Sequence, residues 1–569
     1  MIESIVEIGK YVEKRGIYSH PFVQVPYDEK QGENAKVIIL NLKKLQGNKL
    51  DFVKLEQEHY KIENIPLYCY REKGRRGSAK SFTFKLPPSK GMLKERLKVI
   101  EIFGYTLSYP LEEIENKILN FVNTLKDRGE IAKNTPLLLS IKIDGKWPAK
   151  IPGYLESFEK VSWENFRTQH AQNGKCHICG GEGELYDKFY NYSNKLKFFN
   201  LDKHGFISGV LKPLAWKQFS LCRNCLKYLA LGITYITDPQ GLSFDFYGHK
   251  FWLIPHTLKD VTNTLDVLKT IHTWTPEKNY EREEWILIQA GNQGNNVLFN
   301  FIFYREQNDF KILLHLENII PSLISNFVRT KRKVEENWQD TLYLQDKINF
   351  KFFSSSNLRK TKADPGFTDD DFFKTVQAVF YQKSLDEKRL LSLIMDRVQS
   401  DFFASNERHI PYFTILEALV SLDLLRQWGV IKRNVNGGDK VKLHYNELFE
   451  SHPTFFDHPS KKLLVLLGVL LQRFLYFQKK ERGSTPFVKK LKGLKLQQKD
   501  IQNLFKEVNT KMQEYDISHY WKELKEDIAT LFLYSGDSWP LNVDEIGFYL
   551  SVGMALAFND IFKREEKEE

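Results

Sequence analysis

The sequence predicts an α+β protein: a mixed N-terminal region with an inserted four-cysteine zinc ribbon, followed by an all-helical C-terminal bundle. Strand-like and helix-like patterns alternate up to residue 350, whereas helical spacing dominates from residue 369 onward. Four of the five cysteines lie in two Cys-x-x-Cys pairs inside the mixed region. At 569 residues the chain is too long for one hydrophobic core, so we expect several domains.

The composition favours a cytoplasmic protein. The first residues lack the basic and apolar segments of a secretory signal. The longest apolar run, residues 463–471, is shorter than the roughly 18 residues that a membrane span needs. Only Cys69 lies outside the paired cysteines, so a disulfide framework is not expected and the cysteine usage fits a reducing compartment.

Residues 1–160 are predicted to form a mixed α/β region. Helical spacing and acidic first turns indicate helices, and short apolar runs indicate buried strands. Helices are expected at residues 2–12 and 111–125, and strands at residues 35–42, 65–70, 82–87 and 137–143.

Residues 74–81 are a near miss to a nucleotide phosphate loop. That loop needs a glycine directly before its lysine and a helix after it, but here Ala79 precedes the lysine and a strand pattern follows. We interpret the segment as a basic hairpin loop. Its cations Arg75, Arg76 and Lys80 are candidates for contact with a nucleic-acid backbone.

The most specific signal lies in the predicted zinc-ribbon insertion at residues 161–240. Each Cys-x-x-Cys pair places two sulfurs on one tight knuckle, and two knuckles together give the tetrahedral thiolate site that zinc prefers. The predicted ligands are Cys176, Cys179, Cys222 and Cys225. Forty-two residues separate the pairs, more than the usual spacing of about 12–20, so a ribbon with an insertion is indicated. Two disulfides or a chance arrangement are the alternatives. His177 and His204 could compete as ligands, but four thiolates already complete the shell.

Residues 241–350 are expected to continue the mixed region. Apolar residues alternate on both sides of a polar turn at residues 307–309, which predicts a β-hairpin over residues 296–316. A second basic cluster follows on a predicted helix and consists of Arg329, Lys331, Arg332 and Lys333.

From residue 351 the chain is predicted to be helical, with a helical region at 351–451 and a separate C-terminal bundle at 452–569. Residues 360–367 are typical of a linker. Thr368 can cap a helix whose first turn holds three aspartates, and we favour this helix start over a metal site. The expected helices span residues 369–404, 411–428, 460–481, 497–515, 519–534 and 543–563.

The net charge of +11 is concentrated in residues 461–499, here called the basic segment. This segment holds eleven lysines and arginines and one acid, whereas the rest of the chain is nearly neutral. A localised positive field suits a polyanion, and a solvated helical face is the alternative. The candidate nucleic-acid contacts are Lys479, Lys480, Arg482, Lys489, Lys490, Lys492 and Lys495.

Motifs of known catalytic sites are missing from the sequence. It contains no His-Glu-x-x-His, no Gly-x-Ser-x-Gly and no His-Asp dipeptide. Paired Cys-x-x-Cys knuckles also frame one class of nucleases, but these carry an adjacent Asp-His, and here Lys203 separates Asp202 from His204. No second metal ligand accompanies that histidine, so we expect a protein without catalytic residues rather than a zinc-framed nuclease.

Three segments resemble the large subunit of type I-B CRISPR Cascade complexes. They are residues 199–232 with the second cysteine knuckle, residues 311–322 after the predicted hairpin, and residues 481–493 after the long apolar helix. Because they occur in order in a chain of this length, the resemblance covers the whole sequence. Residues 1–150 share it only diffusely, which leaves the family's target-motif loops unplaced.

This resemblance implies a non-enzymatic, prokaryotic protein with structural zinc. Such subunits bind guide RNA and target DNA beside backbone, guide-handle-capping and small subunits. They check the motif next to the target, hold the displaced strand and recruit a helicase–nuclease. The C-terminal bundle would correspond to the Cascade small subunit. The rival interpretation is a stand-alone zinc-ribbon DNA-binding factor, which would not purify with guide RNA.

Overall fold

The structure is a computed structural model, and it describes most of the chain. The described residues are 1–16, 22–23, 25–27, 29–71, 81–87, 91–132, 134–164, 166–199, 212–257, 262–273, 282–293, 297–307, 310–339, 350–353, 368–404, 411–431 and 443–568. Several predicted features lie outside these ranges: the basic loop with Arg75, Arg76 and Lys80, the linker at residues 360–367, and His204.

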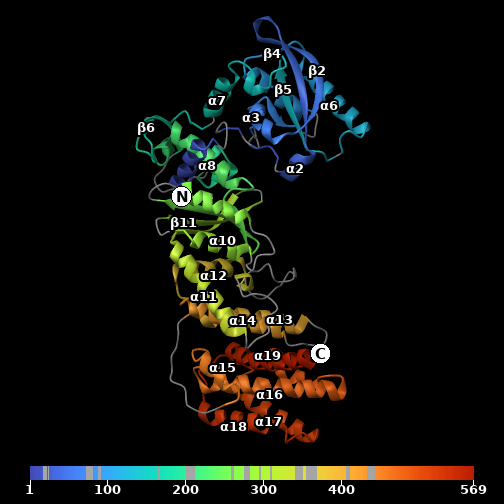
Figure 1. Cartoon of the computed structure of the whole chain (residues 1–569), viewed down its shortest axis with the longest axis vertical. Coiled ribbons are helices and arrows are strands. Elements are labelled where there is room, and N and C mark those ends of the chain that lie inside the picture. The colour runs from blue at the N-terminus through green and yellow to red at the C-terminus, as the bar shows by residue number, and fades with distance from the viewer. Residues whose placement is uncertain are drawn as a thin grey trace. The chain divides into compact units, whose positions relative to one another are not determined.

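The chain divides into two compact units. Figure 1 colours their elements by residue number, from blue at the N-terminus to red at the C-terminus. The first unit contains residues 1–244, 249–273 and 296–318, and the second contains 245–248, 274–295 and 319–569. The five domains expected from the sequence and their boundaries stay a prediction. In the described ranges, every helix is too short or too polar to span a lipid bilayer.

The first unit mixes helices with three sheets, as the α+β fold class predicts. Its helices are α1 (Ile2–Lys14), α2 (Glu29–Asn34), α3 (Ile65–Tyr68), α4 (Met92–Leu97), α5 (Val99–Ile102), α6 (Leu111–Asp127), α7 (Tyr154–Glu164), α8 (Arg223–Thr237) and α9 (Thr262–Leu268). Its strands are β1 (Lys36–Lys44), β2 (Lys49–His59), β3 (Thr83–Lys85), β4 (Thr106–Leu107), β5 (Leu137–Ile143), β6 (Asn173–Lys175), β7 (Glu182–Tyr186), β8 (Leu221–Cys222), β9 (Ser243–Phe246), β10 (His249–Thr257), β11 (Val297–Glu306) and β12 (Phe310–Ile319).

A five-stranded sheet of order β3-β5-β1-β2-β4 forms the N-terminal part of this unit. Strand β1 lies at its centre because it pairs antiparallel with β2 and parallel with β5. Its residues from Val37 to Leu42 are buried, as a continuous apolar run predicts. An aromatic cluster that includes Tyr60 and Tyr68 packs on one face of this strand.

The predicted strand at residues 65–70 is wrong. This segment instead begins with the short helix α3, which has a proline in its first turn. Proline at that position fixes a helical φ and needs no N–H partner. The helix ends at Cys69, which adopts a left-handed conformation with φ of 52°. Only Tyr68, Cys69 and Tyr70 of this segment are buried, in a turn that packs against the sheet and is not a strand of it.

A second sheet of order β12-β11-β10-β9 contains the predicted hairpin. Strands β11 and β12 are neighbours in it, which confirms the hairpin, and β10 pairs antiparallel with β11. Phe251 on β10 stacks on Phe301 and Phe303 of β11, with ring centroids 5.7 and 5.3 Å apart. This sheet packs against α1, since Ser4 Oγ lies 3.0 Å from His256 Nδ1.

Two glycines let α1 and α8 cross in close contact. A Cβ on Gly9 would lie 1.8 Å from the Tyr228 carbonyl oxygen, and a Cβ on Gly232 would lie 2.1 Å from that of Ile5. No side chain fits into either gap. The N-terminal helix is therefore fixed against the helix that carries the last cysteine of the zinc ribbon.

The described part of the second unit from residue 319 onward contains helices and no strand beyond the end of β12. They are α11 (Pro321–Gln339), α12 (Asp369–Tyr381), α13 (Glu387–Ala404), α14 (Tyr412–Gln427), α15 (Asn446–Ser451), α16 (Pro459–Arg482), α17 (Gln498–Glu514), α18 (Lys522–Ser535) and α19 (Val543–Glu568), and α10 (Arg282–Gly291) joins them from earlier in the chain. The predicted cap is confirmed: Thr368 and Asp371 form a reciprocal capping box. The helix predicted over residues 369–404 is instead two helices, because Gln382 adopts a left-handed conformation and ends α12.

Helix α16 is the central element among the C-terminal helices, with α19 on one side and α18 on the other (Figure 1). Its residues from Leu463 to Leu471 are all buried, as the apolar run predicts. Two glycines again allow close contact. A Cβ on Gly468 would lie 2.1 Å from the Leu550 carbonyl oxygen, and a Cβ on Gly553 would lie 1.9 Å from that of Val465.

We predict that Gly468→Ala loosens the contact between α16 and α19. Alanine favours a helix by about 1 kcal/mol over glycine. Overpacking costs about 1–3 kcal/mol or more, and here the conflict is with backbone atoms that cannot turn aside. Amide hydrogen exchange in α16 and α19 should therefore become faster. Lys480→Ala, on the exposed end of the same helix, is the control and should leave exchange unchanged. Unchanged exchange in Gly468→Ala would contradict the tight contact.

Candidate metal centre and nucleic-acid interface

A three-stranded sheet of order β6-β7-β8 brings the two cysteine knuckles together. The first knuckle is the turn of the β6–β7 hairpin, in which Lys175 pairs with Glu182. The second knuckle begins at the end of β8, where Cys222 pairs with Leu185 of β7. Strand pairing therefore joins the knuckles, whatever the length of chain between them.

Backbone hydrogen bonds shape both knuckles. In the first, Cys176 N–H donates to Gly181 at 2.9 Å and Gly180 N–H donates to Cys176 at 2.9 Å. Gly180 has φ of 70°, a conformation that favours glycine. In the second, Cys222 caps α8 and its sulfur accepts the N–H of Cys225 at 3.5 Å.

The four sulfurs fit a tetrahedral zinc site. All lie within 4.8 Å of one another, and the sulfurs of Cys179 and Cys222 are 3.7 Å apart. Zinc–sulfur bonds of about 2.3 Å give a tetrahedron with edges of about 3.8 Å, whereas a disulfide bond is only about 2.05 Å long. The set matches the donor type and number of a structural zinc site. The four cysteines can therefore bind a metal ion such as zinc.

The electrostatics of the cluster also favour a cation. Burial raises the pKa of Cys176, but N–H groups of Cys179, Cys222 and Ile178 outweigh it and lower the pKa to about 7. Burial and the negative charge of the neighbouring sulfurs raise the pKa of Cys225. Without a cation the cluster holds one thiolate readily and resists a second, and a zinc ion removes this repulsion.

His177 does not belong to the sulfur cluster. Its Nδ1 accepts the N–H of Ser220 at 3.0 Å, and its ring lies 5.3 Å from that of Phe219. The histidine thereby ties the first knuckle to the chain entering the second. Between the knuckles, the rings of Phe189, Phe199 and Phe219 form their own small core, with centroids 5.2–5.8 Å apart.

Sequence reasoning missed a polar groove of about 680 Å³ beside the ribbon. Arg223, which follows a ligand cysteine, lies 5.0 Å above the Trp163 ring and 3.4 Å from Glu159, both on α7. The groove also contains Arg167 paired with Glu184. Both arginines of the groove are therefore paired, and the contacts of Arg223 attach the ribbon to α7.

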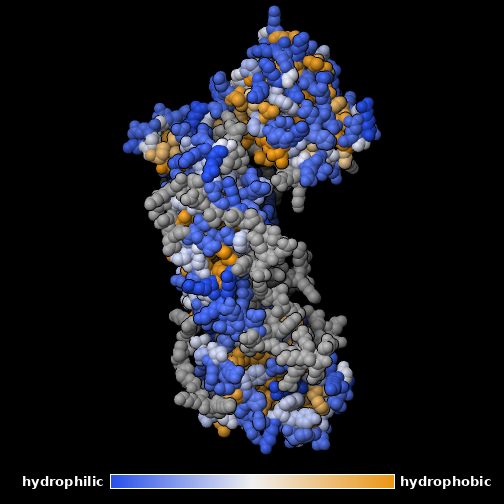
Figure 2. Space-filling view, viewed as in Figure 1, coloured by the Kyte–Doolittle hydropathy of each residue, from blue (hydrophilic) through white to orange (hydrophobic). Residues whose placement is uncertain are grey.

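The basic segment presents two kinds of cation. Lys479, Lys480, Lys489 and Lys495 are exposed, and none forms an ion pair with another described residue. Lys490 and Lys492 instead pair with Glu507 at 3.1 Å and Asp500 at 2.7 Å on α17. Arg482 lies 4.9 Å above the ring of Tyr515. On the face in Figure 2, the visible described part of the C-terminal helices is hydrophilic with smaller hydrophobic patches.

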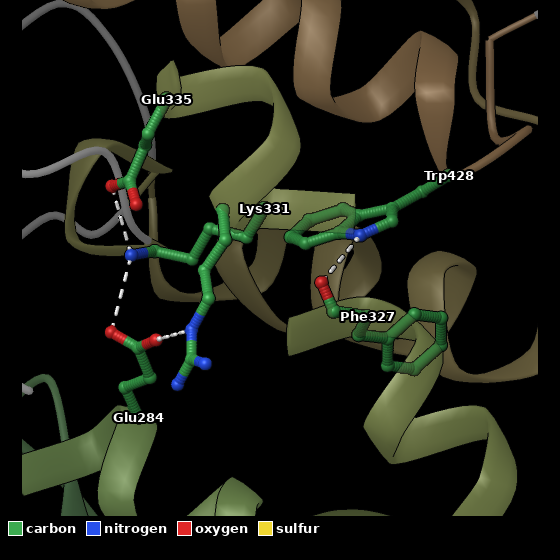
Figure 3. A network of polar contacts seen from close by, with 6 residues as sticks. Glu284, Phe327, Lys331, Glu335 and Trp428 are labelled. Atoms are coloured by element: carbon green, nitrogen blue, oxygen red, sulfur yellow. Dashed lines mark hydrogen bonds and ion pairs between the residues drawn. The ribbon is translucent and has the colours of Figure 1, made fainter. Parts of the chain in front are cut away.

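The members of the second basic cluster differ in burial. Lys331 is buried on α11 and reaches between Glu335 at 2.9 Å and Glu284 at 3.4 Å, as Figure 3 shows. Arg332 Nε donates to Glu284 at 3.3 Å. Near this network, Trp428 donates to the Phe327 carbonyl at 3.3 Å. The ammonium of Lys331 therefore holds α10 against α11 and is not a surface cation.

The other members of this cluster face a groove of about 580 Å³ between α10 and α11. Arg329 and Lys333 are exposed along it, and Arg332 is partly exposed. Asn292 and Ser325 add polar atoms, and Glu336 is its one described acid.

Comparison with known families adds one finding. The chain matches three parts of the family described as CRISPR-associated protein TM1802 (cas_TM1802). The N-terminal domain matches residues 1–160, the central domain 173–319 and the C-terminal domain 347–568. The chain belongs to this family. A search of curated proteins gives no match.

Membership of the CRISPR-associated TM1802 family confirms the coarser part of the resemblance stated above. All four ligand cysteines and both strands of the β11–β12 hairpin lie within the central-domain match. The basic segment lies within the C-terminal match. The subtype and the role within a complex stay predictions.

We predict that the purified TM1802-family protein contains one zinc ion per chain. Cys222→Ser removes a ligand and should lower the zinc content and the solubility, because binding at such sites supplies about 10–16 kcal/mol in model peptides. Cys69→Ser is the matched control, since this buried cysteine lies outside the cluster. Elemental analysis should find full zinc in the control. Full zinc in Cys222→Ser, or none in the unaltered protein, would contradict the site.

We also predict that Lys331→Ala destabilises the second unit by about 3 kcal/mol, because it leaves the buried Glu284 with less compensating charge. Urea unfolding followed by tryptophan fluorescence measures this, since Trp338 lies on α11 and Trp428 packs against Phe327 of the same helix. Lys333→Ala, two residues away and exposed, should change stability by less than about 0.5 kcal/mol. Equal stabilities of the two variants would contradict a structural role for Lys331.

Proposed function

We propose that this protein is the non-catalytic large subunit of a CRISPR RNA-guided DNA surveillance complex, a type I-B Cascade. It would check the motif beside the target, stabilise the opened DNA and recruit a helicase–nuclease for antiviral defence. Its partners would be guide RNA, target DNA, and the backbone, guide-handle-capping and small subunits. Family membership over nearly the whole chain is the observation that carries this proposal.

The exposed lysines of the basic segment support a role in holding single-stranded DNA. A lysine without an ion-pair partner can bind a phosphate directly, whereas a paired lysine must first break its ion pair with a carboxylate. Such contacts do not read bases, and this suits a subunit of a complex in which guide pairing supplies the sequence specificity. We therefore assign the strongest contacts to Lys479, Lys480, Lys489 and Lys495. Lys490, Lys492 and Arg482 would contribute less.

The groove between α10 and α11 supports a second contact. Arg329, Arg332 and Lys333 line it, and we assign them to the duplex beside the target. Lys331 is not included, because its ammonium is engaged between two carboxylates. Arg75, Arg76 and Lys80 remain candidates on sequence grounds alone.

The zinc site fits a structural role in this proposal. Four thiolates complete the shell of a tetrahedral zinc ion and leave no position for a reacting water. We accordingly propose that DNA cutting is done by the recruited nuclease. A zinc-framed nuclease would need His204, and His204→Ala should leave target degradation intact in a reconstituted system. A stand-alone DNA-binding factor is the remaining alternative.

Salt dependence tests the role of the basic segment in a reconstituted complex. Replacing Lys479, Lys480, Lys489 and Lys495 by alanine should spare assembly and guide binding but weaken DNA opening, measured by permanganate reactivity of thymines in the displaced strand. Each lost phosphate contact lowers the salt slope of single-strand binding by about 0.7. Binding should therefore depend less on salt in the variant.

Two double variants with the same charge change sharpen this test. Lys479→Ala with Lys480→Ala removes exposed cations without ion-pair partners among the described residues. Lys490→Ala with Lys492→Ala removes cations that are already paired with Glu507 and Asp500. The first pair should weaken opening more than the second. Unchanged opening and salt slope in the fourfold variant would overturn the assigned role of the segment.

A further inference from the structure

The turn between α17 and α18, residues 515–521, carries a group of aromatic side chains. We call it the aromatic loop. Its aromatic residues are Tyr515, His519, Tyr520 and Trp521. The loop packs against the end of α16, because Phe477 on that helix contacts both Tyr515 and Tyr520, with centroids 5.8 and 6.4 Å apart. The sequence shows these aromatic residues but does not show that they gather beside the basic segment.

Tyr520 is the accessible tyrosine of the aromatic loop. It is 42% exposed. Its ring lies 4.7 Å from His519, 5.9 Å from Trp521 and 6.4 Å from Phe477, with interplanar angles of 84°, 71° and 86°. All three contacts are edge-on, and in the described part of the chain none is a parallel stack. An accessible tyrosine held by its edges can offer a flat face to another planar group.

The loop is held in place by its backbone and by one buried side chain. Tyr520 N–H donates to Ile517 at 3.0 Å. Gln478, buried at the end of α16, donates to the Tyr515 hydroxyl at 3.2 Å and accepts the N–H of Phe487 at 3.0 Å. Phe487 lies in the same short 3-10 segment, Pro486–Leu494, as Lys489. One glutamine thus fixes the aromatic loop and the basic segment to the same helix end.

Cations border this aromatic surface. Arg482 lies over the Tyr515 ring, and Lys479 and Lys480 lie within one turn of Phe477 on α16. Glu481 and Asp516 are exposed acids in the same area. These acids oppose a phosphate placed directly on the loop, but they do not oppose an uncharged base. The arrangement therefore separates a surface for bases from a row of cations for phosphates.

We propose that Tyr520 is a stacking site for an unpaired base of single-stranded nucleic acid whose backbone follows the neighbouring lysines. The inference rests on the proposed function, because it deepens the single-strand contact assigned to the basic segment. Stacking on an aromatic ring tolerates any base, so it adds affinity without adding sequence preference. It also distinguishes a single strand from a duplex, whose bases are already stacked on each other.

The test measures the affinity of the full chain for two oligonucleotides of equal length and charge. One is a 20-nucleotide oligothymidylate, and the other carries abasic sites throughout. The unaltered protein should bind the thymidylate more tightly. Tyr520→Ala should weaken thymidylate binding by about tenfold and leave abasic binding unchanged. Tyr520→Phe should keep the difference. Tyr534→Ala, which removes an exposed tyrosine at the other end of α18, is the matched control and should behave as the unaltered protein.

The outcomes separate this inference from the proposed function. Lys479→Ala with Lys480→Ala should weaken both oligonucleotides alike. If the unaltered protein binds both equally and Tyr520→Ala changes neither, the stacking site is wrong while the phosphate contacts stand. If neither oligonucleotide binds, the assigned role of the basic segment fails together with this inference. If Tyr520→Ala leaves both affinities intact but removes a protein subunit from the purified complex, the ring docks a protein and the proposal is overturned.

Discussion

The convergence of four cysteine sulfurs is the constraint on which the first unit depends. A three-stranded sheet holds them within 4.8 Å of one another, where burial and mutual repulsion oppose a second thiolate unless a cation is present. Cys222 and Cys225 lie at the N-terminus of α8. Helix α1 packs against α8 at glycines where no side chain would fit. Metal binding therefore reaches beyond the ribbon. A bound metal would order the helix against which the N-terminus and, through α1, the β9–β12 sheet are packed.

Local pattern predicts much of this fold, and tertiary contacts explain the rest. The Thr368 cap, the buried α16 and the cysteine spacing are local signals, and each gives the observed element. The run at residues 65–70 misleads because a proline and a left-handed Cys69 turn it into a short helix. The burial of Lys331 cannot be predicted, because its partner Glu284 lies 47 residues earlier and on another helix. The aromatic loop likewise becomes a surface only when Phe477 packs beneath it.

Neighbouring carboxylates determine which lysines of the basic segment are available to bind phosphate. The sequence treats all lysines of the basic segment alike, yet α17 supplies Asp500 and Glu507 to two of them. Lys479, Lys480, Lys489 and Lys495 keep exposed ammonium groups. The same distinction applies to α11, where Lys331 and Lys333 are two residues apart but one is buried and the other exposed. A +10 segment is therefore less informative than the pairing of its individual charges.

The central claim is that this CRISPR-associated protein works as one subunit of an RNA-guided complex. Purification of the tagged chain from its own host, followed by sequencing of the bound RNA and identification of the bound proteins, tests it most directly. The account predicts short guide RNAs of uniform length together with several other CRISPR-associated subunits. A chain that purifies alone, without RNA, and still binds duplex DNA would contradict the account and favour a stand-alone DNA-binding factor.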